Sequence, residues 1–281
     1  MTAQRIVVVG ARGQLGRALL AALSSHTLLP LARPEADVAD PSIADRVVEL
    51  RPDVVINAAA WTDVDGAEDH PDACYAANVL GAVYLAQACG RIGAALVQIS
   101  TNEVFPGEPG QLYREWDPPQ PRSGAYAASK AAAERAALSL TGGRCYVVRT
   151  AWVYHRGGNN FVTKIIAAAD RYGSLRVVAD EFGNPTYAPD LAAAIARLIA
   201  TERYGIYHLT NSGFCSRYQW AVEILRLAGR EHVPVTPIGL ADWPRRTRPP
   251  AHAVLLNTAA AALGIALRPW QEGLRAYFGE Q

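Results

Sequence analysis

A short apolar run leads directly into three regularly spaced glycines near the start of the chain. Residues 6–9 (Ile-Val-Val-Val) are β-branched, which favours a strand buried on both faces of a parallel sheet. Glycines between such a strand and a helix at residues 17–23 let the backbone approach a pyrophosphate, and the helix N-terminus offers free N–H groups. The sequence predicts a dinucleotide-binding turn, with a plain strand-to-helix turn as the alternative. Its predicted cofactor-contacting residues are Gly10, Arg12, Gly13, Gln14, Leu15 and Gly16.

Strand-like and helix-like segments then alternate along the first half of the chain. A helix is predicted at residues 42–50, capped by Asp40 or Ser42, because either side chain can accept from a free backbone N–H. Repeated βα units predict an α/β fold with a doubly wound, Rossmann-like parallel sheet. Besides the first strand, the predicted strands are residues 27–31, 53–60, 95–101, 145–150 and 206–209, and a long helix is predicted at residues 73–92.

Several motifs fall where these strands end. Ligands of doubly wound sheets bind beyond the carboxyl ends of the strands, and the stretches at residues 57–60, 100–101 and 150–154 all lie there. We therefore expect small and polar side chains at these ends to contact the cofactor. The residues predicted to do so are Ala58, Ala59, Ala60 and Ser100.

The pattern changes after about residue 155, where Pro and Gly become frequent. We expect residues 1–154 to form the NAD(P)-binding domain, completed by segments around 186–209. Residues 155–281 are expected to form mainly a smaller α+β lobe that binds substrate. Helices are predicted at 190–201 and 216–227, and the Pro-rich residues 106–121 are predicted to form a functional loop.

Composition narrows the class of protein. The chain has 281 residues, half of them hydrophobic, with a net charge of +1, so no global field attracts nucleic acid or an anionic membrane. The four cysteines are scattered, which argues for a reducing compartment and against a structural zinc; no metal site is predicted. Without a signal peptide or an apolar run of membrane-spanning length, the expected location is the cytoplasm.

Tyr126 and Lys130 are four residues apart in an Ala-rich helical stretch. This spacing places both side chains on one face of a helix, one turn apart. A neighbouring ammonium favours the phenolate, so we expect it to lower the pKa of Tyr126 toward neutral pH and to make the phenol a usable proton donor or acceptor. The alternative is a partly buried Tyr beside a solvated Lys.

Several longer blocks resemble the dTDP-4-dehydrorhamnose reductases, a family within the extended short-chain dehydrogenase/reductases. The Tyr-x-x-x-Lys pair and the glycines are typical of the superfamily, and the longer blocks are typical of this family. The resemblance runs from Ile6 to the C-terminus. The blocks that carry it are residues 51–68, 100–107, 149–154, 158–161 and 180–186.

The resemblance implies NADPH- or NADH-dependent reduction of the C4 ketone of a nucleotide-linked 4-dehydro-6-deoxyhexose, giving dTDP-L-rhamnose. It implies that Tyr126 protonates the nascent alkoxide and that Lys130 supports Tyr126 and binds the nicotinamide ribose. Thr101 would hydrogen-bond the ketone oxygen. The expected partner is therefore a dTDP-sugar. Residues placed near this substrate are Thr62, Val64, Asn102, Glu103, Trp152, Asn160 and Arg248.

Two departures from the family pattern bear on the substrate. The family usually carries Tyr where this chain has Glu103, and Asn-Ser where it has His252 and Ala253. An acid at position 103 would alter sugar choice or loop contacts. These departures keep open a reductase or epimerase for another nucleotide deoxysugar. A non-catalytic, cofactor-binding regulatory subunit is a third alternative, against which the presence of Thr101, Tyr126 and Lys130 together argues.

The charged residues leave the cofactor and the phosphate contacts open. Arg12 and Arg33 would favour the 2′-phosphate of NADPH, with a surface position as the alternative for Arg33, whereas Asp37 or Asp40 would pair with the adenosine. Arg248, with its neighbours Arg245 and Arg246, would clamp the substrate pyrophosphate or form a solvated basic loop. The sequence leaves a homodimer open as the assembly.

Overall fold

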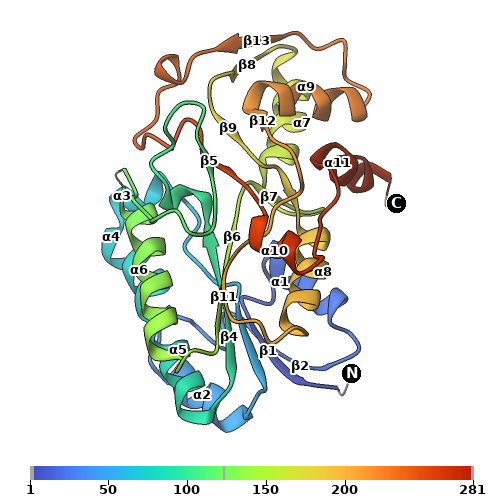
Figure 1. The fold of residues 1–281 in the computed structure, drawn as a ribbon. Helices are drawn as coiled ribbons and strands as arrows, with labels where there is room; N and C mark the ends of the chain where they lie inside the picture. Colours follow the sequence, from blue (N-terminus) through green and yellow to red (C-terminus); the bar gives the residue numbers. More distant parts are fainter. Residues whose placement is uncertain (1–2, 123, 280–281) are drawn as a thin grey trace.

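A six-stranded, entirely parallel sheet forms the centre of the chain (Figure 1). The structure is a computed structural model and describes residues 3–122 and 124–279. The strand order is β2-β1-β3-β4-β6-β11, so the predicted doubly wound α/β fold is confirmed. The strands are β1 (Arg5–Val9), β2 (Thr27–Leu31), β3 (Val54–Asn57), β4 (Ala95–Thr101), β6 (Cys145–Thr150) and β11 (Gly205–His208).

Helices cover both faces of this sheet in two separate layers (Figure 1). In β1, Ile6 and Val8 pack on one face and Val7 and Val9 on the other, because side chains alternate along a strand. The first face is covered by α1 (Gln14–Ala22), α8 (Ala188–Ile199) and α10 (Thr258–Ala262). The second face is covered by α2 (Ser42–Leu50), α5 (Gly81–Ile92) and α6 (Ala125–Leu140).

The long helix predicted at residues 73–92 is present and contains a π-helical turn that the sequence did not indicate. After α3 (Gly66–Asp69) and α4 (Pro71–Tyr75), a π-helical turn at Ala76–Leu80 leads into α5. Asn78 in this turn is buried, accepts from the Trp61 backbone N–H at 2.8 Å and donates to Ser129 of α6 at 2.9 Å. The turn therefore fixes the loop after β3 against α6, a use of π-helical geometry common near functional sites.

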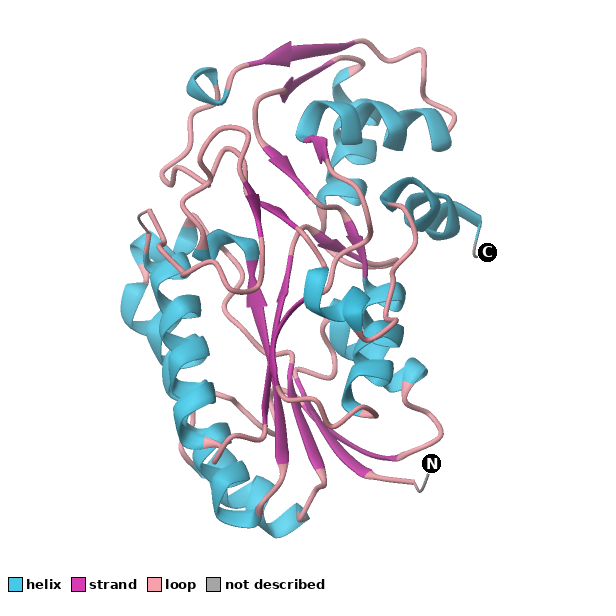
Figure 2. Ribbon diagram, in the orientation of Figure 1, coloured by secondary structure: helices cyan, strands magenta, loops and turns pink. Residues whose placement is uncertain are grey.

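A smaller lobe lies beyond the carboxyl ends of the sheet, where Figure 2 shows several short strands among helices. An aromatic cluster that includes Tyr154, Tyr187 and Trp220 forms its core. Its helices are α7 (Phe161–Tyr172), α9 (Arg217–Leu227) and α11 (Trp270–Gly279). Its strand pairs are β7 (Val153–Tyr154) with β10 (Thr186–Tyr187), β8 (Leu175–Val178) with β13 (Val235–Ile238), and β9 (Phe182–Gly183) with β12 (Cys215–Ser216).

The Pro-rich loop at residues 106–121 was expected to be a functional loop outside the core, but part of it packs into the core. A 3-10 turn at Asn102–Val104 is followed by Phe105, whose ring stacks on Tyr113 with centroids 4.3 Å apart. The loop contains β5 (Leu112–Tyr113), which pairs in parallel with β14 (Val254–Leu255).

A second 3-10 turn is at Leu240–Asp242. Among the described residues, no helix has the length and apolarity needed to cross a membrane.

Gly10 gives a test of how closely β1 and β3 meet at their carboxyl ends. Its φ is +80°, and an added Cβ would lie 2.6 Å from the Ala59 backbone nitrogen, whereas Gly93 has φ +72° and open space around the same position. We expect Gly93→Ala to cost about 1–2 kcal/mol of unfolding free energy from left-handed strain alone. Gly10→Ala adds the backbone overlap and should cost roughly 2–5 kcal/mol in urea unfolding. Equal costs would contradict the close approach.

Candidate active site

The three predicted catalytic residues meet where β4 ends and α6 begins. Thr101 is the last residue of β4, and Tyr126 and Lys130 lie on α6. The Thr101 side chain lies near the Tyr126 hydroxyl and acts to lower its pKa. Glu68 of α3 accepts from the Ala125 backbone N–H at 2.7 Å and so fixes the start of α6. The structure thus brings two hydroxyl groups and an ammonium to the edge of the sheet where ligands of such folds bind.

The expected lowering of the Tyr126 pKa is wrong. Burial raises the pKa of Tyr126, the negative charge of Glu103 raises it further, and only the Thr101 side chain acts in the opposite direction. Removing a phenolate from water disfavours the charged form more than the neighbouring groups stabilise it. Tyr126 is therefore a neutral phenol at physiological pH, which is the form that donates a proton.

Lys130 is buried, and its Nζ donates to the Ile99 backbone carbonyl at 2.6 Å. Burial lowers the pKa of Lys130 to about 8, although the carboxylate of Glu134 opposes the shift. The helix places Glu134 one turn beyond Lys130, since the two are four residues apart. The hydrogen bond to Ile99 thus holds the ammonium against β4, one helical turn from Tyr126.

A buried ion pair lies next to Lys130, on the side away from Tyr126. Arg149 of β6 binds Glu134 with its Nη2 2.8 Å from Oε2, and the side chains are only 1% and 3% exposed. Ser100 donates to the same carboxylate at 2.5 Å, so its hydroxyl points into this network. His208 lies 3.4 Å from Arg149, and burial together with that charge lowers the pKa of His208 to about 3. Neither Glu134 nor Arg149 was predicted as a site residue, although the i,i+4 spacing from Lys130 pointed to Glu134.

The glycine turn has the shape of a pyrophosphate cradle. Gly10 lies against the Ala58–Ala59 backbone, and a Cβ at Gly16 would lie 2.2 Å from the Gly10 carbonyl oxygen. Gly13 is the N-cap of α1, and the first turn of that helix, residues 14–17, carries no acidic side chain. An anion placed there meets free N–H groups and the positive end of the helix dipole. The residues present therefore fit a dinucleotide.

The charged residues near this turn lie at the exposed edge after β2. Arg12 donates to the Arg33 carbonyl at 2.6 Å and binds Glu35 at 3.0 Å. The Asp40 carboxylate accepts from the Ser42 backbone N–H at 2.8 Å, which holds the start of α2. The Ser42 side chain and then this backbone bond lower the pKa of Asp40. Glu35 was not foreseen, and it offsets the charge of Arg12 at the position where the 2′-phosphate was expected.

Gln14 and Asn160, predicted for cofactor and substrate, contact each other. The Asn160 amide donates to Gln14 Oε1 at 2.8 Å, and its Oδ1 caps α7 by accepting from the Thr163 backbone N–H. Gln14 also accepts from the His155 backbone N–H at 3.1 Å. These contacts join the glycine turn to the lobe. The Asn160 side chain is buried in this joint and does not line the pocket beside Tyr126.

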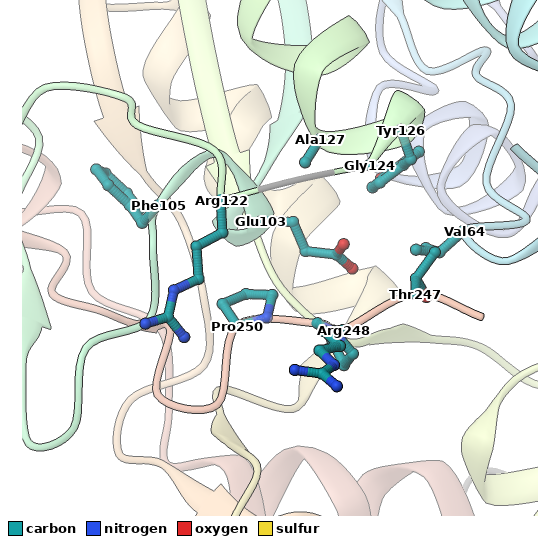
Figure 3. A pocket seen from close by; sticks show the side chains of 11 residues that line it. Val64, Glu103, Phe105, Arg122, Gly124, Tyr126, Ala127, Thr247, Arg248 and Pro250 are labelled. Carbon is teal, nitrogen blue, oxygen red and sulfur yellow. The ribbon is translucent and has the colours of Figure 1, made fainter. Parts of the chain in front are cut away.

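A pocket opens beside Tyr126 (Figure 3). Figure 3 shows the Glu103 carboxylate directed into the space between Tyr126 and Arg248. Burial, together with the charge of Glu181, raises the pKa of Glu103 to about 7, although Arg245 and Arg217 oppose the shift. The lining residues are Val64, Glu103, Phe105, Arg122, Gly124, Tyr126, Ala127, Thr247, Arg248, Pro249 and Pro250.

Other predicted substrate residues lie around this pocket. Asn102 is buried and donates to the Ala253 carbonyl at 3.0 Å, whereas Thr62 is exposed in the loop after β3. Trp152 has φ +45° and carries the guanidinium of Arg217 3.6 Å above its ring centroid. Arg217 also binds Glu181 at 2.9 Å. Sequence reasoning missed both of these charged residues, which stand far apart in the chain.

A segment that we call the strap, residues 244–250, closes one side of the pocket. Arg245 binds Asp65 at 3.4 Å, the Thr247 backbone N–H donates to the same carboxylate at 3.2 Å, and Arg246 binds Asp69. Burial tends to raise the pKa of Asp65, but the bonds from Thr247 and the charge of Arg245 outweigh it and lower the pKa. Two of the three strap arginines are thus paired with acids, and Arg248 lines the pocket.

Comparison with known proteins agrees with this arrangement. The model of the family described as the RmlD substrate binding domain matches residues 4–281. The chain belongs to this family. A Streptomyces griseus protein named dTDP-4-dehydrorhamnose reductase is 40% identical over 283 residues, covering 98% of this chain and 93% of the relative. The spore coat polysaccharide biosynthesis protein SpsK of Bacillus subtilis is 39% identical over 280 residues, covering 99% and 98%.

Solved structures of the family share the fold throughout. The chain matches a dTDP-4-dehydrorhamnose reductase of Bacillus anthracis, solved in complex with NADP, with a TM-score of 0.94, 36% identity and full coverage of both chains. A Thermus thermophilus UDP-glucose 4-epimerase matches with a TM-score of 0.83 at 24% identity, over 98% of each chain, and shows the fold alone. The expected family resemblance is therefore confirmed.

The buried ion pair predicts a large loss of stability when one partner is removed. Glu134→Ala leaves the Arg149 guanidinium buried without its carboxylate, and we expect a loss of about 3–5 kcal/mol in urea unfolding. Glu223→Ala is the matched control, because its pair with Arg226 is exposed by 21% and 54% and should contribute less than about 1 kcal/mol. Similar losses in both variants would show that burial of the pair adds nothing.

The strap predicts a protease-sensitive site that depends on Asp65. Asp65→Asn removes the charge that binds Arg245 and weakens the acceptor for Thr247, so the strap should open more often. We expect trypsin to cut after Arg245 and Arg246 roughly tenfold faster than in the unmodified chain, measured by mass spectrometry. Asp72→Asn, an exposed acid in the first turn of α4, serves as the control and should leave the rate unchanged.

Proposed function

We propose that this chain uses NADPH or NADH to reduce the C4 ketone of a nucleotide-linked 4-dehydro-6-deoxyhexose, converting dTDP-4-dehydrorhamnose to dTDP-L-rhamnose. The observation that carries the proposal is the placement of Thr101 and Tyr126 beside the buried Lys130, at the edge of the sheet that also holds the glycine turn. The names of the Streptomyces and Bacillus anthracis relatives, and the NADP bound to the latter, support this substrate and cofactor.

The hydroxyl groups of this site suit carbonyl reduction. When bound, the reduced nicotinamide supplies the hydride. The ketone oxygen gains negative charge during the reaction, and hydroxyl donors from Thr101 and Tyr126 stabilise that charge. Tyr126, kept neutral by its raised pKa, then gives its proton to the alkoxide. The Lys130 ammonium lies one helical turn away, where it would support the phenolate that remains and bind the nicotinamide ribose.

We assign the two halves of the molecule different tasks. Residues 1–154, with segments around 186–209, would bind the cofactor through Gly10, Gly13 and Gly16, and residues 155–281 would bind mainly the sugar nucleotide. The free N–H groups at the start of α1 support the first assignment. The pocket position of Arg248 supports a contact with the substrate pyrophosphate, since a guanidinium fork suits phosphate oxygens.

The remaining expected roles follow from position. Ala58, Ala59 and Ala60 follow β3, where they would pack against the cofactor, and Val64 and Glu103 would face the sugar. Glu103 favours a second candidate function, the reduction of a different nucleotide deoxysugar, because it places an acid in the pocket. We propose a cytoplasmic enzyme that acts on a dTDP-sugar, with a homodimer as the assembly to be tested by light scattering.

Tyr126→Phe tests the reaction and the proton donor together. The variant keeps the ring but removes the proton, so we expect kcat to fall about 10²- to 10⁴-fold, while NADPH binding followed by fluorescence stays within twofold. NADPH and NADH oxidation with dTDP-4-dehydrorhamnose would be measured for both proteins. Tight NADPH binding without turnover in the unmodified chain would reject this substrate and favour another sugar or a regulatory, non-catalytic role.

A further inference from the structure

Glu103 is an ionisable group in the active pocket that the proposed mechanism does not use. It lies in the 3-10 turn after β4, and its backbone N–H donates to the Thr101 hydroxyl at 3.2 Å. Figure 3 shows its carboxylate directed into the pocket that Tyr126 and Arg248 also line. The position of Glu103 is therefore fixed by a catalytic residue, and its charge faces the reacting groups.

Charged groups from four other elements act on this carboxylate. Arg217 at the start of α9 and Glu181 before β9 form one ion pair at 2.9 Å. Arg245 of the strap and Asp65 before α3 form another at 3.4 Å. Each arginine already forms an ion pair with another acid, so it stabilises the Glu103 carboxylate less than an unpaired arginine would. Burial and the charge of Glu181 dominate and raise the pKa of Glu103 to about 7.

The charge of Glu103 opposes the chemistry of Tyr126. Transfer of the phenol proton to the substrate alkoxide breaks the O–H bond of Tyr126 and leaves a phenolate in a buried site. A carboxylate beside it adds a second negative charge, and the ionised form of Glu103 raises the pKa of Tyr126. Neutral Glu103 removes this repulsion and makes the proton easier to transfer.

We propose that Glu103 acts through Tyr126 as the group that sets the pH range of turnover, with the protonated carboxyl as the competent form. The inference rests on the proposed reduction. It assigns this position a task that an uncharged residue cannot perform: activity declines as pH rises through the physiological range. Glu103 is a positioning residue in this scheme, because it acts on the proton donor.

The test is the pH dependence of kcat between pH 5.5 and 9 with saturating NADPH and dTDP-4-dehydrorhamnose. We expect kcat of the unmodified chain to fall about tenfold between pH 6 and pH 8.5, with a first inflection near 7. Glu103→Gln should lack that inflection and decline only at higher pH, where Lys130 and Tyr126 titrate in both proteins. An inflection near 7 that persists in Glu103→Gln would overturn the proposal.

Two further variants sharpen the result. Glu103→Tyr, the residue that the family usually carries, should behave as Glu103→Gln does and covers the case in which the Gln variant folds poorly. Glu181→Gln removes a repelling charge and frees Arg217 from its ion pair, so the inflection should move to lower pH. An unmoved inflection in Glu181→Gln would count against Glu103 as its source.

Thermal unfolding separates this inference from the proposed reaction. The folded pKa of Glu103 lies above the ordinary value of 4.5, so its contribution to stability is lost as pH rises from about 4.5 to 7. The melting temperature of the unmodified chain should therefore fall relative to Glu103→Gln between pH 5 and 8. If the melting-temperature difference between the two proteins stays constant from pH 5 to 8, the inference about Glu103 is wrong, but the proposed reduction is unaffected. If the melting-temperature difference between the two proteins falls with pH but the unmodified chain does not turn over dTDP-4-dehydrorhamnose, the proposed reduction is wrong. The proposed action of Glu103 on Tyr126 is then wrong with it.

Discussion

The buried ion pair between Glu134 and Arg149 is the interaction on which the candidate active site at the end of the sheet depends. It joins α6, which carries Tyr126 and Lys130, to β6, the neighbour of β4 in the sheet. Two charges inside a protein are tolerated only when each satisfies the other and the remaining polar atoms find partners. Ser100 and His208 supply those partners here. The pair therefore fixes the height and rotation of α6 relative to the strand that ends in Thr101.

The parts of the fold that follow from local physics were predictable from sequence. The β-branched run before Gly10 indicated a strand buried on both faces, and alternate residues of β1 do pack against different helix layers. Helix α2 has the predicted bounds, although its N-cap is Pro41 and Asp40 contributes by binding the Ser42 backbone N–H. The meeting of Thr101, Tyr126 and Lys130 was predictable because Thr101 ends one strand and the other two share one helix face.

The rest depends on contacts between residues far apart in the chain. No pattern near Gln14 shows that it meets Asn160, and none near Trp152 shows that Arg217 lies on its ring. The sign of the Tyr126 pKa shift was wrong for the same reason. Spacing along α6 revealed Lys130, but burial and the Glu103 charge come from the surrounding fold. Sequence patterns show which groups are near neighbours on an element and miss how far water is excluded from them.

The closure of the site by the C-terminal third has a consequence for synthesis on the ribosome. Asn102 binds the carbonyl of Ala253, and Asp65 binds Thr247, contacts that span 151 and 182 residues. The central strands up to β6 can pair while the chain is still growing, but the pocket wall cannot form until the residues up to Ala253 have emerged. Contacts of such long range also slow folding, because a large loop must close before they form. The nascent chain can thus form five of the six central strands before the strap that closes the pocket has been synthesised.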